Sequence, residues 1–172
     1  YAFHHCNKLL IVHIPSSVIS IGEYAFSESL GMKKIEIPYS VKTIGKYCFS
    51  LTQLTDIVIP SSVTSIGEGA FYGCYLLVNI VLPSHITQIG FEFFFNCSAL
   101  KTVKLPFSLR SIGDNAFSNC QSLKKLEIPS SVIHIGENAF ESCDKLIKIS
   151  IPLTIQDISK IGLNHGIQII RT

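Results

Sequence analysis

Seven prolines divide the chain into units of nearly equal length, and this spacing constrains the fold more than any other feature. The intervals between successive prolines are 23, 22, 23, 23, 23 and 23 residues. These prolines are Pro15, Pro38, Pro60, Pro83, Pro106, Pro129 and Pro152. Glycine and phenylalanine recur with the same period, as in Gly67 with Phe71 and Gly136 with Phe140. A period of about 20 to 29 residues is typical of a solenoid, in which each coil buries its apolar side chains against its neighbours.

Each unit contains three segments with different patterns. Before the proline, residues such as Leu77, Ile80 and Leu82 alternate like a β-strand, and proline ends the strand because it cannot donate to the ladder. After the proline, residues 63–67 turn apolar side chains inward, and we expect the glycine to supply a backbone angle that other residues resist. An Ala-Phe-x-x-Cys segment then suggests a short helical or 3₁₀ turn. The sequence therefore predicts an α/β repeat solenoid with one parallel β-strand per 23-residue repeat and short helical or 3₁₀ turns on the other side.

Three places depart from this pattern. The segment after Phe49 is one residue short and lacks the cysteine, which predicts a tighter or locally deformed coil. Phe93 occupies the alanine position of its unit, which predicts a local bulge or a shifted neighbour. The pattern fails from about residue 159, and residues 167–170 predict a final strand that closes the array. We expect residues 1–172 to form a single solenoid, a piece of a longer array, with a divergent closing segment at about 159–172.

Composition excludes several classes of protein. Hydrophobic residues make up 47% of the 172 residues and charged residues 15%, which excludes a disordered chain. The formal net charge is only +2, so no long-range attraction draws the chain to nucleic acid. No apolar run approaches the roughly 18 residues of a membrane helix, and direct membrane insertion is not expected. The chain begins at Tyr1, already inside a repeat and without a signal peptide, which also suggests a piece of a longer protein.

A known family shares this repeat. The stretch IPSSVTSIGEGAFYGCYLLVNIVLP, residues 59–83, resembles the consensus of BspA-like leucine-rich repeats, also called the Treponema pallidum type. The resemblance extends from Phe3 to about Ile158. It implies a right-handed leucine-rich-repeat coil, a location at the cell surface or in the secreted fraction, and adhesion to host proteins or other cells. The family motif is structural, so the resemblance brings no catalytic residues.

The cysteines and histidines do not indicate a metal, cofactor or catalytic site. Five cysteines share one repeat position and the sixth takes an alanine position: Cys6, Cys74, Cys97, Cys120 and Cys143, and then Cys48. Their parallel Cβ vectors disfavour disulfides, and no close Cys pair indicates zinc, so a ladder of buried thiols is favoured over either. His4, His5 and Cys6 are not expected to hold a metal, because adjacent residues rarely point at one ion. Asn96 fits a glycosylation sequon, which matters only in a secreted chain.

Strand residues that point away from the core form the first candidate binding surface, which we call the strand face. It comprises Asp56, Val58, Asn79, Val81, Thr102, Lys104, Lys125 and Lys148. The two valines form an apolar centre, and lysines gather toward the C-terminal end. Solenoids commonly bind through such an extended face, although a merely solvated sheet would have the same pattern.

The second candidate, which we call the aromatic patch, lies near the Ala-Phe-x-x-Cys turns. It comprises Tyr72, Tyr75, Phe91 and Phe95. Exposed together, these rings would form a binding patch. Alternatively, they pack on one another to cover the irregularity at Phe93.

These observations favour a non-catalytic protein-interaction or adhesion module. The expected partner is a protein, such as a host or extracellular-matrix protein, and not a nucleic acid. A carbohydrate-binding solenoid and a structural spacer remain as alternatives, because a sheet face with aromatic and polar side chains would also suit a glycan.

Overall fold

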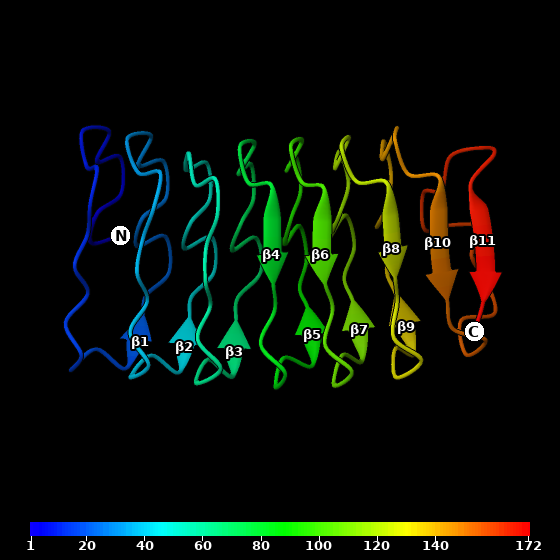
Figure 1. Cartoon of the computed structure of the whole chain (residues 1–172), viewed down its shortest axis with the longest axis horizontal. Coiled ribbons are helices and arrows are strands. Elements are labelled where there is room, and N and C mark those ends of the chain that lie inside the picture. Colours follow the sequence, from blue (N-terminus) through cyan, green and yellow to red (C-terminus); the bar gives the residue numbers. More distant parts are fainter.

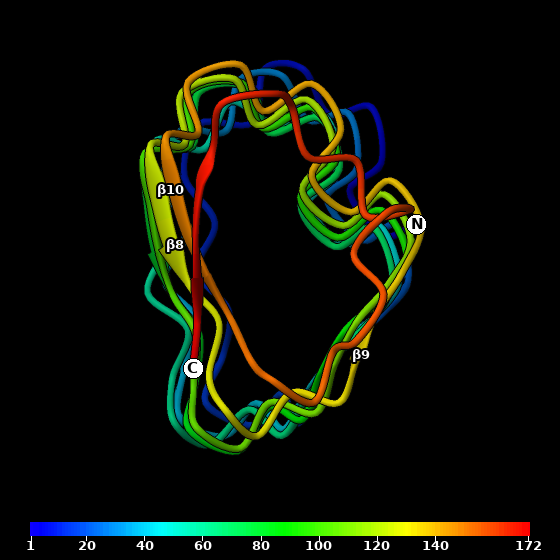
Figure 2. The ribbon, with the colours of Figure 1, turned by 90° about the vertical axis from the view of Figure 1, so that its right-hand side faces the viewer.

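Successive repeats stack side by side along one axis, as the period predicts. The computed structural model describes all 172 residues as a parallel β-solenoid of about seven coils (Figure 1). Figure 2, which looks along the stack, shows β8 and β10 in one wall and β9 in the opposite wall. The walls are held apart by buried side chains from every coil, so the core is as long as the stack.

Two columns of short parallel strands run along the solenoid. One column carries the strand face and contains β4 (Asn79–Val81), β6 (Thr102–Lys104), β8 (Lys125–Glu127), β10 (Lys148–Ile151) and β11 (Gln168–Arg171). The other contains β1 (Ser20–Ile21), β2 (Thr43–Ile44), β3 (Ser65–Ile66), β5 (Gln88–Ile89), β7 (Ser111–Ile112) and β9 (His134–Ile135). Hydrogen bonds join β4 to β6, β8 to β10 to β11, β1 to β2 to β3, and β5 to β7 to β9.

The expectation of one strand per repeat is therefore wrong. The segment after each proline except Pro152 forms a second strand, because its isoleucine points inward while the preceding polar residue points outward. Ile44, for example, is buried beside exposed Thr43, and it pairs in register with Ile66 of the next coil. A strand of two residues is too short for alternation to reveal it in the sequence.

The expected helical or 3₁₀ turns are also absent, since the structure contains no helix. The Phe26 N–H donates to the Cys48 carbonyl of the next coil at 2.9 Å, whereas a helix would use a carbonyl of its own turn. The flanking residues Tyr24 and Glu28 have positive φ angles of 52° and 59°. Left-handed residues at alternating places prevent a right-handed helix from propagating. The segment is instead a run of turns whose alternate N–H groups bond across coils.

The repeated glycine has a different role from the one expected. Gly45 and Gly67 do not have positive φ; they allow two coils to approach closely. A Cβ at Gly67 would lie 2.5 Å from the backbone nitrogen of Lys46, inside the van der Waals limit. The left-handed angles occur elsewhere in the repeat, at residues such as Tyr47 and Asn119.

Phenylalanines form a continuous ladder through the core. Their ring centroids lie 5.2 to 5.8 Å apart from coil to coil. The ladder consists of Phe3, Phe26, Phe49, Phe71, Phe94, Phe117 and Phe140. Its members from Phe49 onward are completely buried, so each coil is stabilised chiefly by its neighbours.

The two irregular coils fit into the stack in different ways. Phe93 is fully buried without interrupting the backbone ladder, because the neighbouring coils place the small Ala70 and Ala116 beside it. Of the two expected accommodations, the local bulge is therefore wrong, whereas the shifted neighbour stays a prediction. In the short coil, Thr52 takes the cysteine position, and its hydroxyl donates to the Phe49 carbonyl at 2.8 Å. In the wall that carries the strand face, this coil forms only a single β-bridge, between Asp56 and Asn79.

The closing strand expected at residues 167–170 is confirmed, displaced by one residue. Strand β11 pairs in parallel with β10, with Ile169 opposite Ile149. No segment forms a helix of the length and apolarity needed to cross a bilayer.

Candidate binding surface

The strand face presents its predicted residues to solvent along one wall of the solenoid. Val58 is 80% exposed and Val81 is 60% exposed. The polar members Asp56, Asn79, Thr102, Lys104 and Lys125 are also exposed, whereas Lys148 is half-buried. The buried residues between them, such as Ile57 and Ile80, attach the face to the core. Outward side chains can therefore contact a partner without disturbing the stack.

The two exposed valines lie along a groove in this wall. The groove has a volume of about 660 Å³ and runs across three coils. Val58, Val81, Lys104 and Phe107 contribute outward side chains to its lining, and Leu105 lies in its floor. The shape and apolar lining make it the best-developed concave feature on the strand face.

Phe107 belongs to this surface, although the alternation of the strands did not point to it. It follows Pro106, and its side chain is 88% exposed. The equivalent residues of the two flanking coils are Ser84 and Ser130. An exposed phenylalanine at a serine position breaks the repeat, and that departure was the available signal.

Polar groups border the groove toward the C-terminal end. The Thr102 hydroxyl donates to the Asn79 side-chain carbonyl, which fixes one flank. Lys125 and Lys148 are direct neighbours in the register of β8 and β10. Lys104 ends β6 beside Val81, its partner in β4. The face is thus apolar at its centre, and lysines outnumber the one exposed glutamate, Glu127, toward the C-terminal end.

The aromatic patch is partly a packed ladder. Tyr72 and Phe95 are half-buried and stacked, with centroids 5.1 Å apart and planes at 7°. Tyr75 and Phe91 remain exposed by 38% and 41%. The stack continues outside the predicted patch through Tyr47, whose ring meets Tyr72 edge-on at 6.0 Å. Stacked faces are shielded from ligands, so the patch offers ring edges more than ring faces.

Tyr47 is held in this outer ladder by a contact that spans two coils. Its hydroxyl donates to a Glu92 carboxylate oxygen at 3.1 Å. Burial, followed by the negative charge of Glu92, raises the pKa of Tyr47 to about 12. The neutral phenol is therefore the form that the folded chain favours.

The cysteines form a ladder of hydrogen bonds inside the solenoid, and all six are free. Four thiols each donate to the carbonyl of the core phenylalanine one coil earlier, at 3.1 to 3.3 Å: Cys74, Cys97, Cys120 and Cys143. Ser29 makes the same bond to Phe3 in the coil where serine replaces cysteine. Only Cys6 is not fully buried. Small donors at this position thus join a coil to the one before it, except at Thr52, whose hydroxyl donates within its own coil.

Burial also changes the acidity of these thiols. It raises the pKa of Cys74 to about 11 and that of Cys143 to about 12. It also holds the pKa values of Cys48, Cys97 and Cys120 well above the ordinary value. Such thiols remain protonated and are poor nucleophiles or metal ligands.

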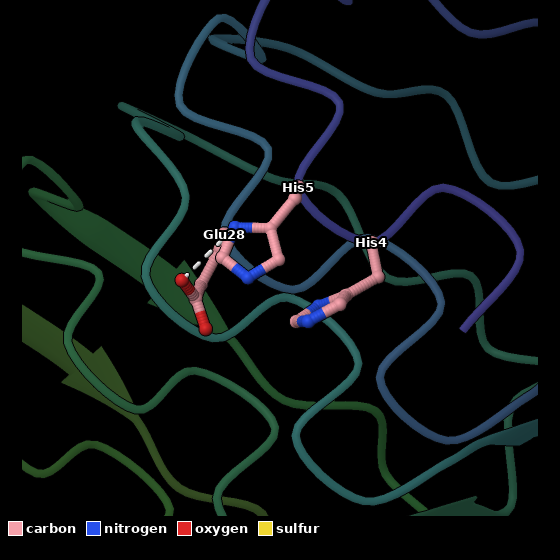
Figure 3. Close-up of side chains that lie close together, drawn as sticks. All are labelled: His4, His5 and Glu28. Atoms are coloured by element: carbon pink, nitrogen blue, oxygen red, sulfur yellow. Dashed lines mark ion pairs between the residues drawn. The ribbon is translucent and has the colours of Figure 1, made fainter.

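A cluster of titratable side chains lies on the first two coils, where His4, His5 and Glu28 come together (Figure 3). The His5 Nδ1 lies 3.2 Å from a Glu28 carboxylate oxygen, and one ligand atom from each of the three residues lies within 4.8 Å of the other two. The two adjacent histidine rings lie side by side, with centroids 4.1 Å apart. Glu28 went unnoticed because it is 23 residues from His5, one full coil away.

The fold and its repeated contacts define a stacked leucine-rich-repeat solenoid. The sequence matches the profile described as the BspA type leucine rich repeat region in six copies, over residues 1–97 and 64–166. The chain therefore belongs to the BspA-type leucine-rich repeat family. A comparison with curated proteins found no match.

Solved structures of related repeats agree. A leucine-rich repeat protein of T. pallidum is 32% identical with a TM-score of 0.76, and the match covers 84% of this chain and 68% of that one. One from Bacteroides ovatus is 30% identical with a TM-score of 0.68, covering 99% of this chain and 47% of that one. A leucine rich cell surface protein of Faecalibacterium prausnitzii is 27% identical with a TM-score of 0.52, covering 99% and 62%. This chain thus spans about half the length of the Bacteroides ovatus protein.

Proposed function

We propose that this chain is a non-catalytic protein-binding module of a cell-surface or secreted adhesion protein, and that its partner docks on the strand face. The observation that carries the proposal is the groove around Val58 and Val81. Exposed apolar side chains that line a concave surface are a common mark of a protein interface. The relationship to a cell surface protein of Faecalibacterium prausnitzii supports the proposed location.

The chemistry of the surface indicates the kind of partner. An apolar centre formed by Val58, Val81 and Phe107 suits a protein segment with large apolar side chains. Lys125 and Lys148, which are neighbours in β8 and β10, suit acidic groups at one end of that segment. The partner we propose is therefore a host or extracellular-matrix protein with an apolar, partly acidic binding segment. Charged residues at such a border chiefly affect the association rate and its salt dependence.

A glycan is less well matched to this chain. Carbohydrates stack on the faces of aromatic rings, and the faces of Tyr72 and Phe95 are turned toward each other. The groove has polar lining residues such as Asn79 and Ser84, but only one aromatic ring, that of Phe107, on which a sugar could stack. A carbohydrate-binding role and a purely structural role are the alternatives that the experiment must separate.

The test is binding to immobilised extracellular-matrix proteins and to a glycan array, followed by paired substitutions. Val58→Glu with Val81→Glu should leave the unfolding free energy within about 0.5 kcal/mol, since both residues are exposed. The same pair should weaken protein binding at least tenfold, because it places two charges at the apolar centre.

The matched control is Tyr72→Ala with Phe95→Ala in the aromatic patch. The strand-face assignment is wrong if this pair abolishes binding while the valine pair leaves it unchanged. Binding to glycans alone would support the carbohydrate alternative, and binding to neither would support the spacer.

A further inference from the structure

We propose that His4, His5 and Glu28 form a binding site for one divalent transition-metal ion of the zinc type. The three side chains project from neighbouring turns of the first two coils (Figure 3). This inference concerns a different part of the surface from the strand face and does not depend on the proposed function.

The register of the stack brings His5 and Glu28 together. His5 stands two residues after Phe3, and Glu28 stands two residues after Phe26, so they occupy the same repeat position. Both residues have left-handed backbones, with φ angles of 57° and 59°. The His5 N–H bonds to the Ser27 carbonyl at 3.0 Å, and the Glu28 N–H bonds to the Ser50 carbonyl at 2.8 Å. Two equivalent backbones, each tied to the next coil, direct their side chains the same way.

The separation of the first two ligands matches a coordination shell. Two ligand atoms bound tetrahedrally to zinc at about 2.0 to 2.1 Å lie about 3.3 Å apart. The His5 Nδ1 and the nearest Glu28 oxygen are 3.2 Å apart. Without an ion, the same contact is an exposed hydrogen-bonded ion pair of little stability, in which zinc would take the place of the His5 proton.

His4 is oriented as metal-binding histidines usually are. Its Nδ1 lies 3.1 Å from the Ser27 carbonyl oxygen, which can only accept a hydrogen bond, so Nδ1 carries the proton. The lone pair of neutral His4 is consequently on Nε2, free to bind an ion. A backbone carbonyl that receives the other ring N–H is a recurring support of metal-bound histidine. The same carbonyl also accepts the His5 N–H, which links the two histidines through one atom.

The ligand set selects the class of ion. Two imidazoles and a carboxylate suit zinc and its neighbours in the first transition row, whereas calcium and magnesium require oxygen ligands. One ring nitrogen of each histidine and one Glu28 carboxylate oxygen lie within 4.8 Å of one another, and the side chains are at least partly exposed, so small torsional changes can close them on one ion. Three protein ligands leave a fourth position for water. A bound ion would join the first coil to the second.

Isothermal titration with zinc chloride, on the untagged chain at neutral pH, tests the site. We expect one zinc ion per chain, no binding of magnesium, and weaker zinc binding at pH 5, because the imidazoles must be deprotonated. His4→Ala, His5→Ala and Glu28→Gln should each weaken zinc binding at least tenfold. His134→Ala, which alters an exposed histidine of β9, should have no effect.

The half-buried Cys6 supplies a second control, since it is the most accessible thiol. Cys6→Ser should retain zinc binding, and the cobalt complex should show visible bands without the intense thiolate-to-cobalt absorption in the near ultraviolet. Zinc should also raise the unfolding temperature of the parent chain and of Cys6→Ser, but not of His5→Ala. The site is overturned if no saturable zinc binding occurs, if the histidine variants bind as the parent does, or if Cys6→Ser alone loses binding.

Discussion

The Tyr47 ring lies directly against the α-carbon of Gly69 in the next coil. A Cβ at Gly69 would collide with the ring carbons of Tyr47. Because Gly69 has no side chain, the Tyr47 ring can lie over Gly69 and contact the ring of Tyr72. The Tyr47 hydroxyl can then reach Glu92 in the coil beyond. The outer aromatic ladder thereby changes from the repeat position of Tyr47 to that of Tyr72.

Gly69→Ala should destabilise the chain by more than a left-handed angle alone would cost. The φ of 57° should cost alanine about 1 to 2 kcal/mol, and the collision with Tyr47 adds about 1 to 3 kcal/mol. Gly166→Ala is the matched control, because Gly166 has a φ of 84° and nothing within 4 Å of its would-be Cβ. Urea denaturation measures both losses. Equal losses in the two variants would show that the ring contact contributes nothing.

Thiol labelling should distinguish one cysteine from five. Cys6 is half-buried, whereas the other five thiols are buried, and burial raises the pKa of each of those five. The folded chain should therefore react rapidly at one thiol and slowly at five, and the unfolded chain should react at six without reductant. Cys6→Ser should remove only the rapid phase. Fewer than six reactive thiols in denaturant would contradict the free-thiol ladder.

Stability should decrease on the alkaline side. Burial raises the pKa of Cys74 from 9.0 to about 11, and burial with Glu92 raises the pKa of Tyr47 from 10.0 to about 12. A group whose pKa is raised in the folded state stabilises the fold in its protonated form. This stabilisation is complete below the unfolded-state pKa and is lost as pH rises through the folded-state pKa. The free energy of unfolding should thus fall from about pH 9 for the thiol and from about pH 10 for the phenol.

Tyr47→Phe separates these two contributions. It removes the phenol but keeps the ring, so the decline should become shallower above pH 10 and remain unchanged between pH 9 and 10. Urea denaturation at several pH values measures the profile. A profile that Tyr47→Phe leaves unaltered at every pH would refute the role of this phenol.

The periodicity was sufficient to predict the stack, its core and the outward residues of one wall. Alternation around Ile57 and Ile80 assigns Val58 and Val81 to the surface, where the structure places them. The turns were mispredicted because the Ala-Phe-x-x-Cys spacing looks helical locally, while the N–H groups bond to the next coil. The left-handed residues there include Tyr24 and Leu51, which carry no sequence signal for such an angle.

Two residues of the candidate sites that the sequence did not reveal both depend on comparison between coils. Phe107 lies beyond a proline, outside the alternating strand, and only comparison with Ser84 and Ser130 of the flanking coils makes it unusual. Glu28 meets His5 through the stacking register, which places residues 23 apart side by side. Local patterns within one repeat could not reveal the exposed Phe107 or the His5–Glu28 contact. Aligning the repeats position by position could have shown both.

Phe107 should contribute to partner binding without contributing to folding. Phe107→Ser restores the residue type of the flanking coils. Because the ring is 88% exposed, the free energy of unfolding should change by no more than about 0.5 kcal/mol. Because the ring borders the groove with Val81, its loss should weaken binding to an immobilised matrix protein severalfold. Leu153→Ser is the matched control: Leu153 also follows a proline and is 66% exposed, but it lies two coils away and outside the groove. Surface plasmon resonance on the two purified variants measures the difference. If Leu153→Ser weakens binding as much as Phe107→Ser does, exposed apolar groups at the corners act nonspecifically and the groove is not the site.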